Sequence, residues 1–281
     1  MQILNKPITS REHKLILRVE PFSERDKGSD SFMKWLGSVV EVQGGEVEKE
    51  VEEKERRVWY LDTPDQRLYQ NNFSLRLREE MEASKKFKLT LKHRNPDRYL
   101  SASQDVTVAT STGVGQEDVE TKFEEDILCQ FVSKFAHSTS VRFNALPELR
   151  IIADVLAIFP GLSSLGASPD MPITRAKDFY EIKRESGKID FGEKPKVKPC
   201  LSFWYPSTVA TGQPVVAEFS FDYDVLKEEQ KRLAEHPDSL EQFPLLVVKR
   251  STAFFMALHQ TQGAVSWFDL NRTTKTDWVY E

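Results

Sequence analysis

The chain lacks the features that mark membrane proteins, secreted proteins and disulfide-linked folds. Its 281 residues include two cysteines, Cys129 and Cys200, which form no metal-ligand spacing and suit a reducing environment better than a disulfide framework. No apolar run approaches the roughly 20 residues that a membrane-spanning helix needs. The first residues, MQILNKPITSREHK, contain no apolar signal-peptide core. These absences predict a globular, cytoplasmic protein with no membrane partner.

Motifs of several common enzyme classes are also missing. There is no Walker-A loop, no GxSxG nucleophile elbow and no GxGxxG dinucleotide fingerprint. The five histidines show no zinc-ligand spacing. The formal net charge of −5 gives no indication of a nucleic-acid surface, so a site for an anion has to be a local concentration of basic side chains.

Alternation of apolar and polar residues predicts a protein rich in β-strands. Such alternation, with its period of two, is typical of strands that bury one face. The predicted strands cover residues 11–19, 57–62, 74–79, 87–92, 179–185 and 215–223, with two further strands at 104–109 and 121–127. Helical patterns occur at 30–42, 126–137, 147–158, 224–235 and 244–260. The charged run 46–57 fits either an exposed helix or a strand extension.

The chain has no internal repeat, and its turn signals indicate how the predicted elements are connected. Ser186-Gly187 predicts a hairpin between 179–185 and 188–191. The stretch 159–172 is the best candidate for a long loop, but strand-like sequence resumes after it. We therefore expect one domain over residues 1–281, with a helical insertion around 126–172 and helices at the C-terminal end.

The polar faces of the predicted strands carry charges of one sign in pairs. Side chains at i and i+2 share a face, so Arg76 lies beside Arg78, and Lys88 lies near Lys92. Acidic pairs occur elsewhere, at Glu124/Asp126 and Glu218/Asp222. An ordinary amphipathic sheet would alternate in the same way, but its solvated face would usually mix signs. The pairs favour an α+β fold: an antiparallel β-barrel, or tunnel, of about eight strands, with an ionic interior and helices packed outside.

Five segments in order resemble a known family. They are Glu12-His13-Lys14, YLDTPDQRL at 60–68, SLRLR at 74–78, FKLTLK at 87–92 and EFSFD at 218–222. Together they resemble the pattern of CYTH proteins, also called triphosphate tunnel metalloenzymes, over residues 10–260. The resemblance implies a closed barrel that hydrolyses inorganic triphosphate, thiamine triphosphate or a nucleoside triphosphate. A related adenylate-cyclase-type reaction is an alternative within the same family.

The resemblance also implies roles for particular residues. Basic side chains would bind the triphosphate, and carboxylates would hold Mg²⁺ or Mn²⁺. The implied phosphate-binding residues are Lys14, Arg76, Arg78, Lys88, Lys92 and Arg175. The implied metal ligands are Glu12, Glu124, Asp126, Glu218 and Asp222, of which Glu12 and Glu218 would be catalytic.

Two positions depart from the family pattern. Ser10 stands where the first strand would carry its first acid, and Ser220 occupies the middle of the late acidic strand. Both departures fall on the metal-binding side, whereas the basic side is complete. The sequence therefore supports phosphate binding more strongly than metal catalysis. Two hypotheses remain: a metal-dependent triphosphatase, and a non-catalytic binder of phosphate or polyphosphate.

Overall fold

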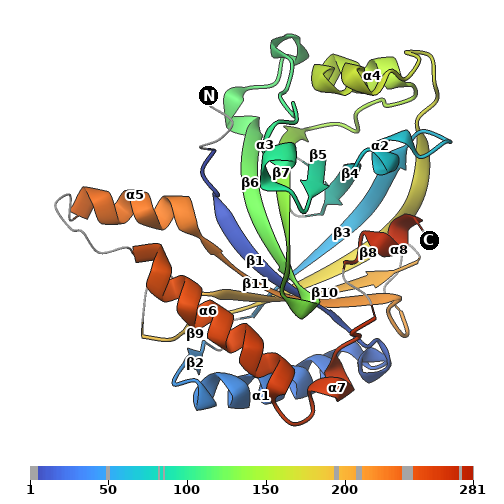
Figure 1. Ribbon diagram of the computed structural model, residues 1–281. Helices are drawn as coiled ribbons and strands as arrows, with labels where there is room; N and C mark the ends of the chain where they lie inside the picture. The colour runs from blue at the N-terminus through green and yellow to red at the C-terminus, as the bar shows by residue number, and fades with distance from the viewer. Residues whose placement is uncertain are drawn as a thin grey trace.

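Nine strands close into a β-barrel in the computed structural model (Figure 1). The structure describes residues 6–48, 51–81, 83–84, 86–192, 196–206, 211–235, 243–271 and 274–280. The barrel strands follow the spatial order β1-β11-β10-β8-β3-β4-β5-β7-β6, and β6 pairs with β1 to close the ring. Their bounds are β1 (Ser10–Leu17), β3 (Val51–Asp62), β4 (Phe73–Glu80), β5 (Phe87–Asn95), β6 (Val119–Leu128), β7 (Val132–Phe143), β8 (Thr174–Ser186), β10 (Lys198–Tyr205) and β11 (Val216–Asp224).

The barrel confirms the predicted fold class and corrects two details. It has nine strands in place of about eight, and the β1–β6 pair is parallel while the other neighbouring pairs are antiparallel. The predicted strand at 104–109 has no strand structure, whereas β7 and β10 are additional. Residues 51–57 of the ambiguous charged run extend β3.

The predicted helix at 126–137 is wrong, because these residues end β6 and begin β7. A 3₁₀ turn at Cys129–Phe131 separates the two strands, and Phe131 adopts a φ of 60°. This turn resets the alternation between the strands. Apolar residues on either side of it therefore fall at spacings of three and four, which imitate a helix. Within the predicted helical insertion, residues 126–172, the structure has an α-helix, α4 (Ile152–Ile158), and a 3₁₀ segment, Pro160–Leu165.

The predicted hairpin at Ser186-Gly187 is also wrong. After β8 the chain forms β9 (Ile189–Asp190), which pairs with β2 (Glu46–Val47) in a separate small sheet. The strand that returns along β8 is β10. Gly187 lies against Glu48, and an added Cβ there would come within 2.6 Å of the Glu48 side chain, so the turn packs on β2 instead of reversing tightly.

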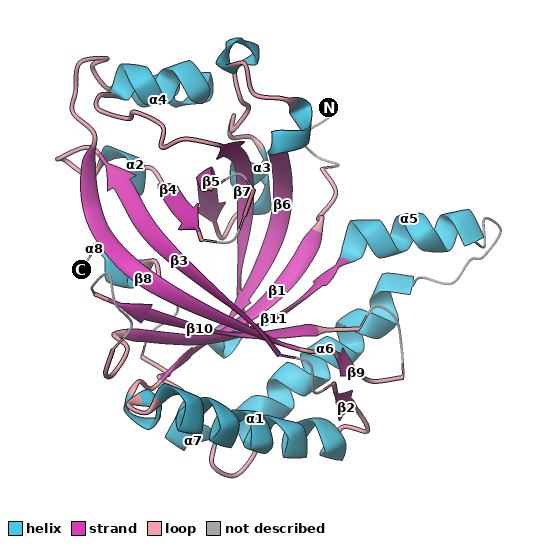
Figure 2. Cartoon of the chain, turned by 180° about the vertical axis from the view of Figure 1, so that it is seen from behind, coloured by secondary structure: helices cyan, strands magenta, loops and turns pink. Residues whose placement is uncertain are grey.

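Helices cover the outside of the barrel and bury its apolar face. The remaining helices are α1 (Arg25–Val42), α2 (Arg67–Gln70), α3 (Arg98–Ala102), α5 (Val225–Glu235), α6 (Phe243–Gln260), α7 (Ala264–Trp267) and α8 (Asp277–Tyr280). Phe32 of α1 and Phe254 of α6 join one core cluster with the outward-facing Phe219 and Phe221 of β11. Figure 2 shows α1 and α6 side by side beneath the barrel. Burial of this outer face leaves the inner face free to be polar.

No helix in the described ranges is long and apolar enough to cross a membrane.

Candidate functional site

The barrel encloses a cavity of ≈ 380 Å³ whose lining is mostly charged. This volume lies within the range of about 300–1,000 Å³ that small-molecule sites occupy. Among the described lining residues, eleven are Lys or Arg and seven are Asp or Glu, an excess of four positive charges. The chain as a whole carries −5, so the cavity, hereafter the lumen, is a local reversal of charge.

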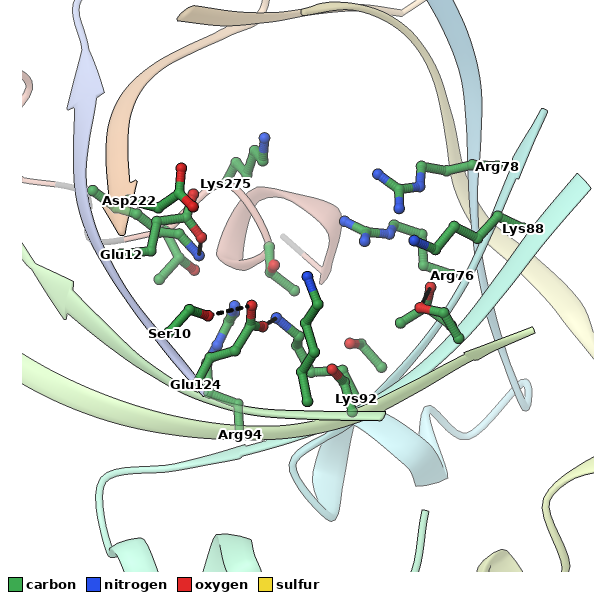
Figure 3. Close-up of a pocket in the computed structure, with 18 of the residues that line it drawn as sticks. Ser10, Glu12, Arg76, Arg78, Lys88, Lys92, Arg94, Glu124, Asp222 and Lys275 are labelled. Carbon is green, nitrogen blue, oxygen red and sulfur yellow. Dashed lines mark hydrogen bonds and ion pairs between the residues drawn. The ribbon is translucent and has the colours of Figure 1, made fainter. Parts of the chain in front are cut away.

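Strand alternation turns four of the six predicted basic residues into the lumen from two adjacent strands. Arg76 and Arg78 point inward from β4, and Lys88 and Lys92 point inward from the adjacent β5. Figure 3 shows Arg76, Arg78 and Lys88 gathered opposite Glu12 and Asp222. The register sets Arg78 across from Lys88, so like charges are direct neighbours. Such repulsion is costly unless an anion is present.

The two arginines of β4 have no carboxylate partner among the residues that the structure describes. Neither forms an ion pair with a residue in the described part of the chain, and the Nε atoms of both are buried without a hydrogen-bond acceptor. Burial, together with the neighbouring Arg76 and Arg56, lowers the pKa of Arg78. A guanidinium still remains protonated at neutral pH. These donors are therefore charged, buried and available to an anion.

Lys88 lies beside these arginines and has one carboxylate partner, Glu120. Burial and the nearby Arg78 lower the pKa of the Lys88 ammonium to about 8, even though Glu120 lies 3.3 Å from its Nζ. A bound anion would reverse this shift by supplying negative charge.

The other predicted phosphate-binding lysines already have carboxylate partners. Lys92 Nζ donates to Glu124 at 3.0 Å. Lys14 Nζ lies 2.8 Å from a carboxylate oxygen of Glu12 and 2.8 Å from one of Asp126. Lys14 therefore lines the lumen mainly as a counter-ion.

The structure separates Arg175 from the site. Its side chain is exposed and its guanidinium stands 5.3 Å from the centre of the Trp59 ring, away from the residues that line the lumen. We therefore leave Arg175 out of the site.

The predicted metal ligands are brought into the barrel interior but are mostly neutralised. Asp126 is fully buried between Lys14 and Arg94, each at 2.8 Å, and these cations keep its pKa low despite the burial. Glu218 lies 2.9 Å from Lys275. Burial raises the pKa of Glu124, but Lys92 outweighs that effect and sets it at about 2.

Glu12 and Asp222 are the carboxylates best placed for a divalent ion. They face each other across the β1–β11 ladder. Burial and the nearby Glu12 raise the pKa of Asp222 to about 6, as expected when like charges share a site. The described residues contain no group of three or more Asp, Glu, His or Cys side chains that could hold a metal. A pair is sufficient where the substrate supplies further oxygens, which is the usual arrangement for Mg²⁺.

Several lumen residues were not predicted. Arg94 continues the inward face of Lys88, Thr90 and Lys92, so one more step of alternation would have found it. Glu181 and Lys183 alternate on β8 in the same way. Lys275 comes from the C-terminal end of the chain, and no pattern in the sequence points to it.

Comparisons with known proteins give structural matches alone. No family model and no curated protein matches the chain. The chain is similar to HpAC1 of Hippeastrum, a candidate adenylyl cyclase with a dominant triphosphatase activity, at 12% identity and a TM-score of 0.41 over 81% of this chain and 85% of that chain. A candidate adenylate cyclase of Bacillus halodurans is 14% identical, with a TM-score of 0.37 over 83% and 93% of the two chains. One from Vibrio parahaemolyticus is 17% identical, with a TM-score of 0.34 over 89% and 90%.

The resemblance of the sequence motifs to CYTH proteins predicted a closed barrel with charged residues, and the structure confirms the barrel.

Proposed function

We propose that the lumen binds a triphosphate-containing small molecule. The observation that carries this proposal is a pair of buried cations, Arg76 and Arg78, that have no carboxylate partner in the described ranges and lie beside Lys88 with its lowered pKa. Buried charges of one sign are strongly unfavourable unless a counter-charge is bound. A linear polyphosphate supplies several anionic oxygens in a row, which suits cations arranged along two adjacent strands.

The excess charge supports a polyanion over a single phosphate. The described lining residues have an excess of four positive charges, or three when Asp126, the buried partner of Lys14 and Arg94, is included. A phosphate monoester group carries about −1.5 to −2 at pH 7 and would leave much of that excess uncompensated. A triphosphate comes closer to neutralising it.

We further propose that hydrolysis of the bound triphosphate is the reaction, assisted by Mg²⁺ or Mn²⁺. Glu12 and Asp222 would hold the ion, and Ser10 Oγ and Lys92 Nζ would keep Glu124 in place nearby at 3.2 Å and 3.0 Å. When bound, the ion supplies Lewis-acid polarisation of a phosphoryl oxygen. Arg76, Arg78 and Lys88 orient the phosphates and neutralise the charge on their oxygens.

A panel of triphosphates tests both parts of this function. Tripolyphosphate, thiamine triphosphate and ATP are incubated with the protein and either metal, and released phosphate and pyrophosphate are measured. We expect phosphate release from at least one of them. Pyrophosphate release with a cyclic nucleotide product would indicate the cyclase alternative. Binding without any release would support the non-catalytic binder, in which Ser10 and Ser220 mark lost acidic positions.

A further inference from the structure

The C-terminal residues Thr274–Tyr280, hereafter the C-terminal strap, close one end of the barrel from inside. Val279 of α8 is 2% exposed and packs with Val58, Phe179 and Trp204, whose side chains share the inward face of their strands. Lys177 Nζ donates to the Trp278 carbonyl at 2.6 Å. Figure 1 shows α8 beside β8. The strap is thus fixed to the barrel by apolar packing and by a hydrogen bond.

This attachment carries Lys275 into the lumen, where all three of its N–H donors find an acceptor. Its Nζ lies 2.9 Å from Glu218 Oε1, 3.1 Å from Ser202 Oγ and 3.4 Å from Glu181 Oε1. An ammonium group has three donors and no acceptor, so this coordination is complete.

Glu218 depends most on this contact, whereas Glu181 also pairs with Arg56 at 3.6 Å and accepts from Trp204 Nε1 at 2.9 Å. The Glu218 and Glu181 side chains are 5% and 7% exposed. Burial alone would lower the pKa of Lys275, but Glu218 and Glu181 raise it above its usual value, so the ammonium stays charged. Loss of one partner from a buried ion pair is strongly destabilising because the other charge is left uncompensated.

We propose that Lys275 is a resident counter-cation that occupies the place of a divalent metal between Glu218 and Glu181. Glu218 is then a ligand of the strap and not of Mg²⁺ or Mn²⁺, and any metal is restricted to the Glu12–Asp222 side of the lumen.

Titration of Mn²⁺ by calorimetry, without any triphosphate, tests this role separately from the proposed function. Four proteins are compared: wild type, Lys275→Met, Lys275→Arg, and the double variant Lys275→Met/Glu218→Gln. Met keeps the length of the side chain and removes its charge. We expect Lys275→Met to gain a Mn²⁺ site at least about tenfold tighter than any site of the wild type, a difference of roughly 1.4 kcal/mol. Lys275→Arg keeps the charge and should not gain the site, and the double variant should lose it.

Folded Lys275→Met that binds Mn²⁺ no better than wild type would overturn the inference. So would a gain that persists in the double variant. If Lys275→Met folds only with Mn²⁺, that rescue supports the inference, because the metal replaces the missing ammonium. If it folds under neither condition, Glu218→Gln alone decides: Mn²⁺ binding equal to that of wild type supports the inference, and weaker binding refutes it.

Discussion

Arg76 and Arg78 have buried Nε atoms without acceptors, which is rare for side chains in folded proteins. Their position follows from the alternation of SLRLR, in which leucines face the helices and arginines face the lumen. This part of the site was predictable from sequence. When the leucine face of a strand packs against the helices outside, its arginine face has to point into the barrel. Which cations would be already paired was not predictable, since pairing depends on strands far apart in sequence, such as β1 and β6 around Lys14.

Replacing both arginines by alanine should remove triphosphate binding without loss of stability. Charged hydrogen bonds contribute about 1.5–3 kcal/mol each, so affinity should fall by about 100-fold or more. The variant should unfold at the same temperature as wild type or higher, because repulsion is relieved. Thermal shift with tripolyphosphate measures both. Arg175→Ala, outside the lumen, serves as control and should bind normally. Equal binding by wild type and the double variant would contradict the assigned site.

Lys88 should make triphosphate binding depend on pH. Its folded-state pKa of about 8 lies below the usual 10.5, so the ammonium of the free protein is charged below pH 8 and loses its proton above it. Affinity should therefore decrease as the pH rises from 7 to 9. The same lowered pKa means that Lys88 lowers the stability of the free protein below pH 8, and that this penalty disappears as the pH approaches 10.5.

Calorimetry of wild type and Lys88→Arg across this pH range checks the effect. Arginine stays charged throughout, so the variant should bind equally well at pH 7 and pH 9 apart from changes in the ligand itself. Parallel pH profiles for the two proteins would show that Lys88 does not titrate in this range.

At the scale of elements, residues 60–68, one of the five segments that resemble CYTH proteins, have a structural function. The Asp62 carboxylate accepts hydrogen bonds from the backbone N–H groups of Thr63, Leu68 and Tyr69 at 2.7, 2.9 and 3.0 Å. It thereby holds α2 between β3 and β4. The segment was recognised from its residues, but its contribution to the lumen is indirect, through the placement of β4.

Asp62→Ala should destabilise the protein by about 1–3 kcal/mol, because three backbone donors in a buried turn lose their acceptor. Denaturant unfolding measures this difference. Asp30→Ala is the control: its carboxylate pairs with Arg184 at 3.4 Å, its side chain is 74% exposed, and its loss should cost less than about 1 kcal/mol. Equal effects of the two substitutions would show that the Asp62 bonds do not stabilise the turn.

The strands that were missed had no visible alternation. In β10, seven of its eight residues are buried, so both faces read as apolar. In β7, the inward residues Ser138 and Ser140 are small, and the turn at Cys129–Phe131 shifts the phase just before the strand. Seven of the nine barrel strands were predicted because one of their faces carries charge.

Strand β1 begins at Ser10, so this residue enters the lumen and does not point to solvent. Ser10 Oγ donates to Glu124 at 3.2 Å, and the ladder places Ser10 opposite Asp224. Ser10→Glu should therefore lower the melting temperature without metal, through repulsion, and should increase stabilisation by Mn²⁺. Thermal melts with and without Mn²⁺ test this, with Ser31→Glu on the exposed side of α1 as control. Equal responses of the two variants would contradict the placement of Ser10.

At the scale of the whole molecule, the protein is acidic, but the lumen inside its barrel has an excess of positive charge. Helices such as α1 and α6 bury the apolar outer face, which allows the interior to be ionic. Such an interior lowers the stability of the free protein and favours the bound form. A ligand that binds only the native state stabilises it by RT ln(1 + [L]/Kd), so the effect should be large at saturating triphosphate.

Calorimetric titration of tripolyphosphate into the wild-type protein at pH 7, with a chelator present to remove divalent ions, tests the central claim most directly. Arg76 and Arg78, which have no carboxylate partner in the described part of the chain, should bind the polyanion at one site per chain, with an affinity that decreases as salt increases. Absence of binding from micromolar to millimolar tripolyphosphate would contradict the account, whatever activity the protein shows with metals.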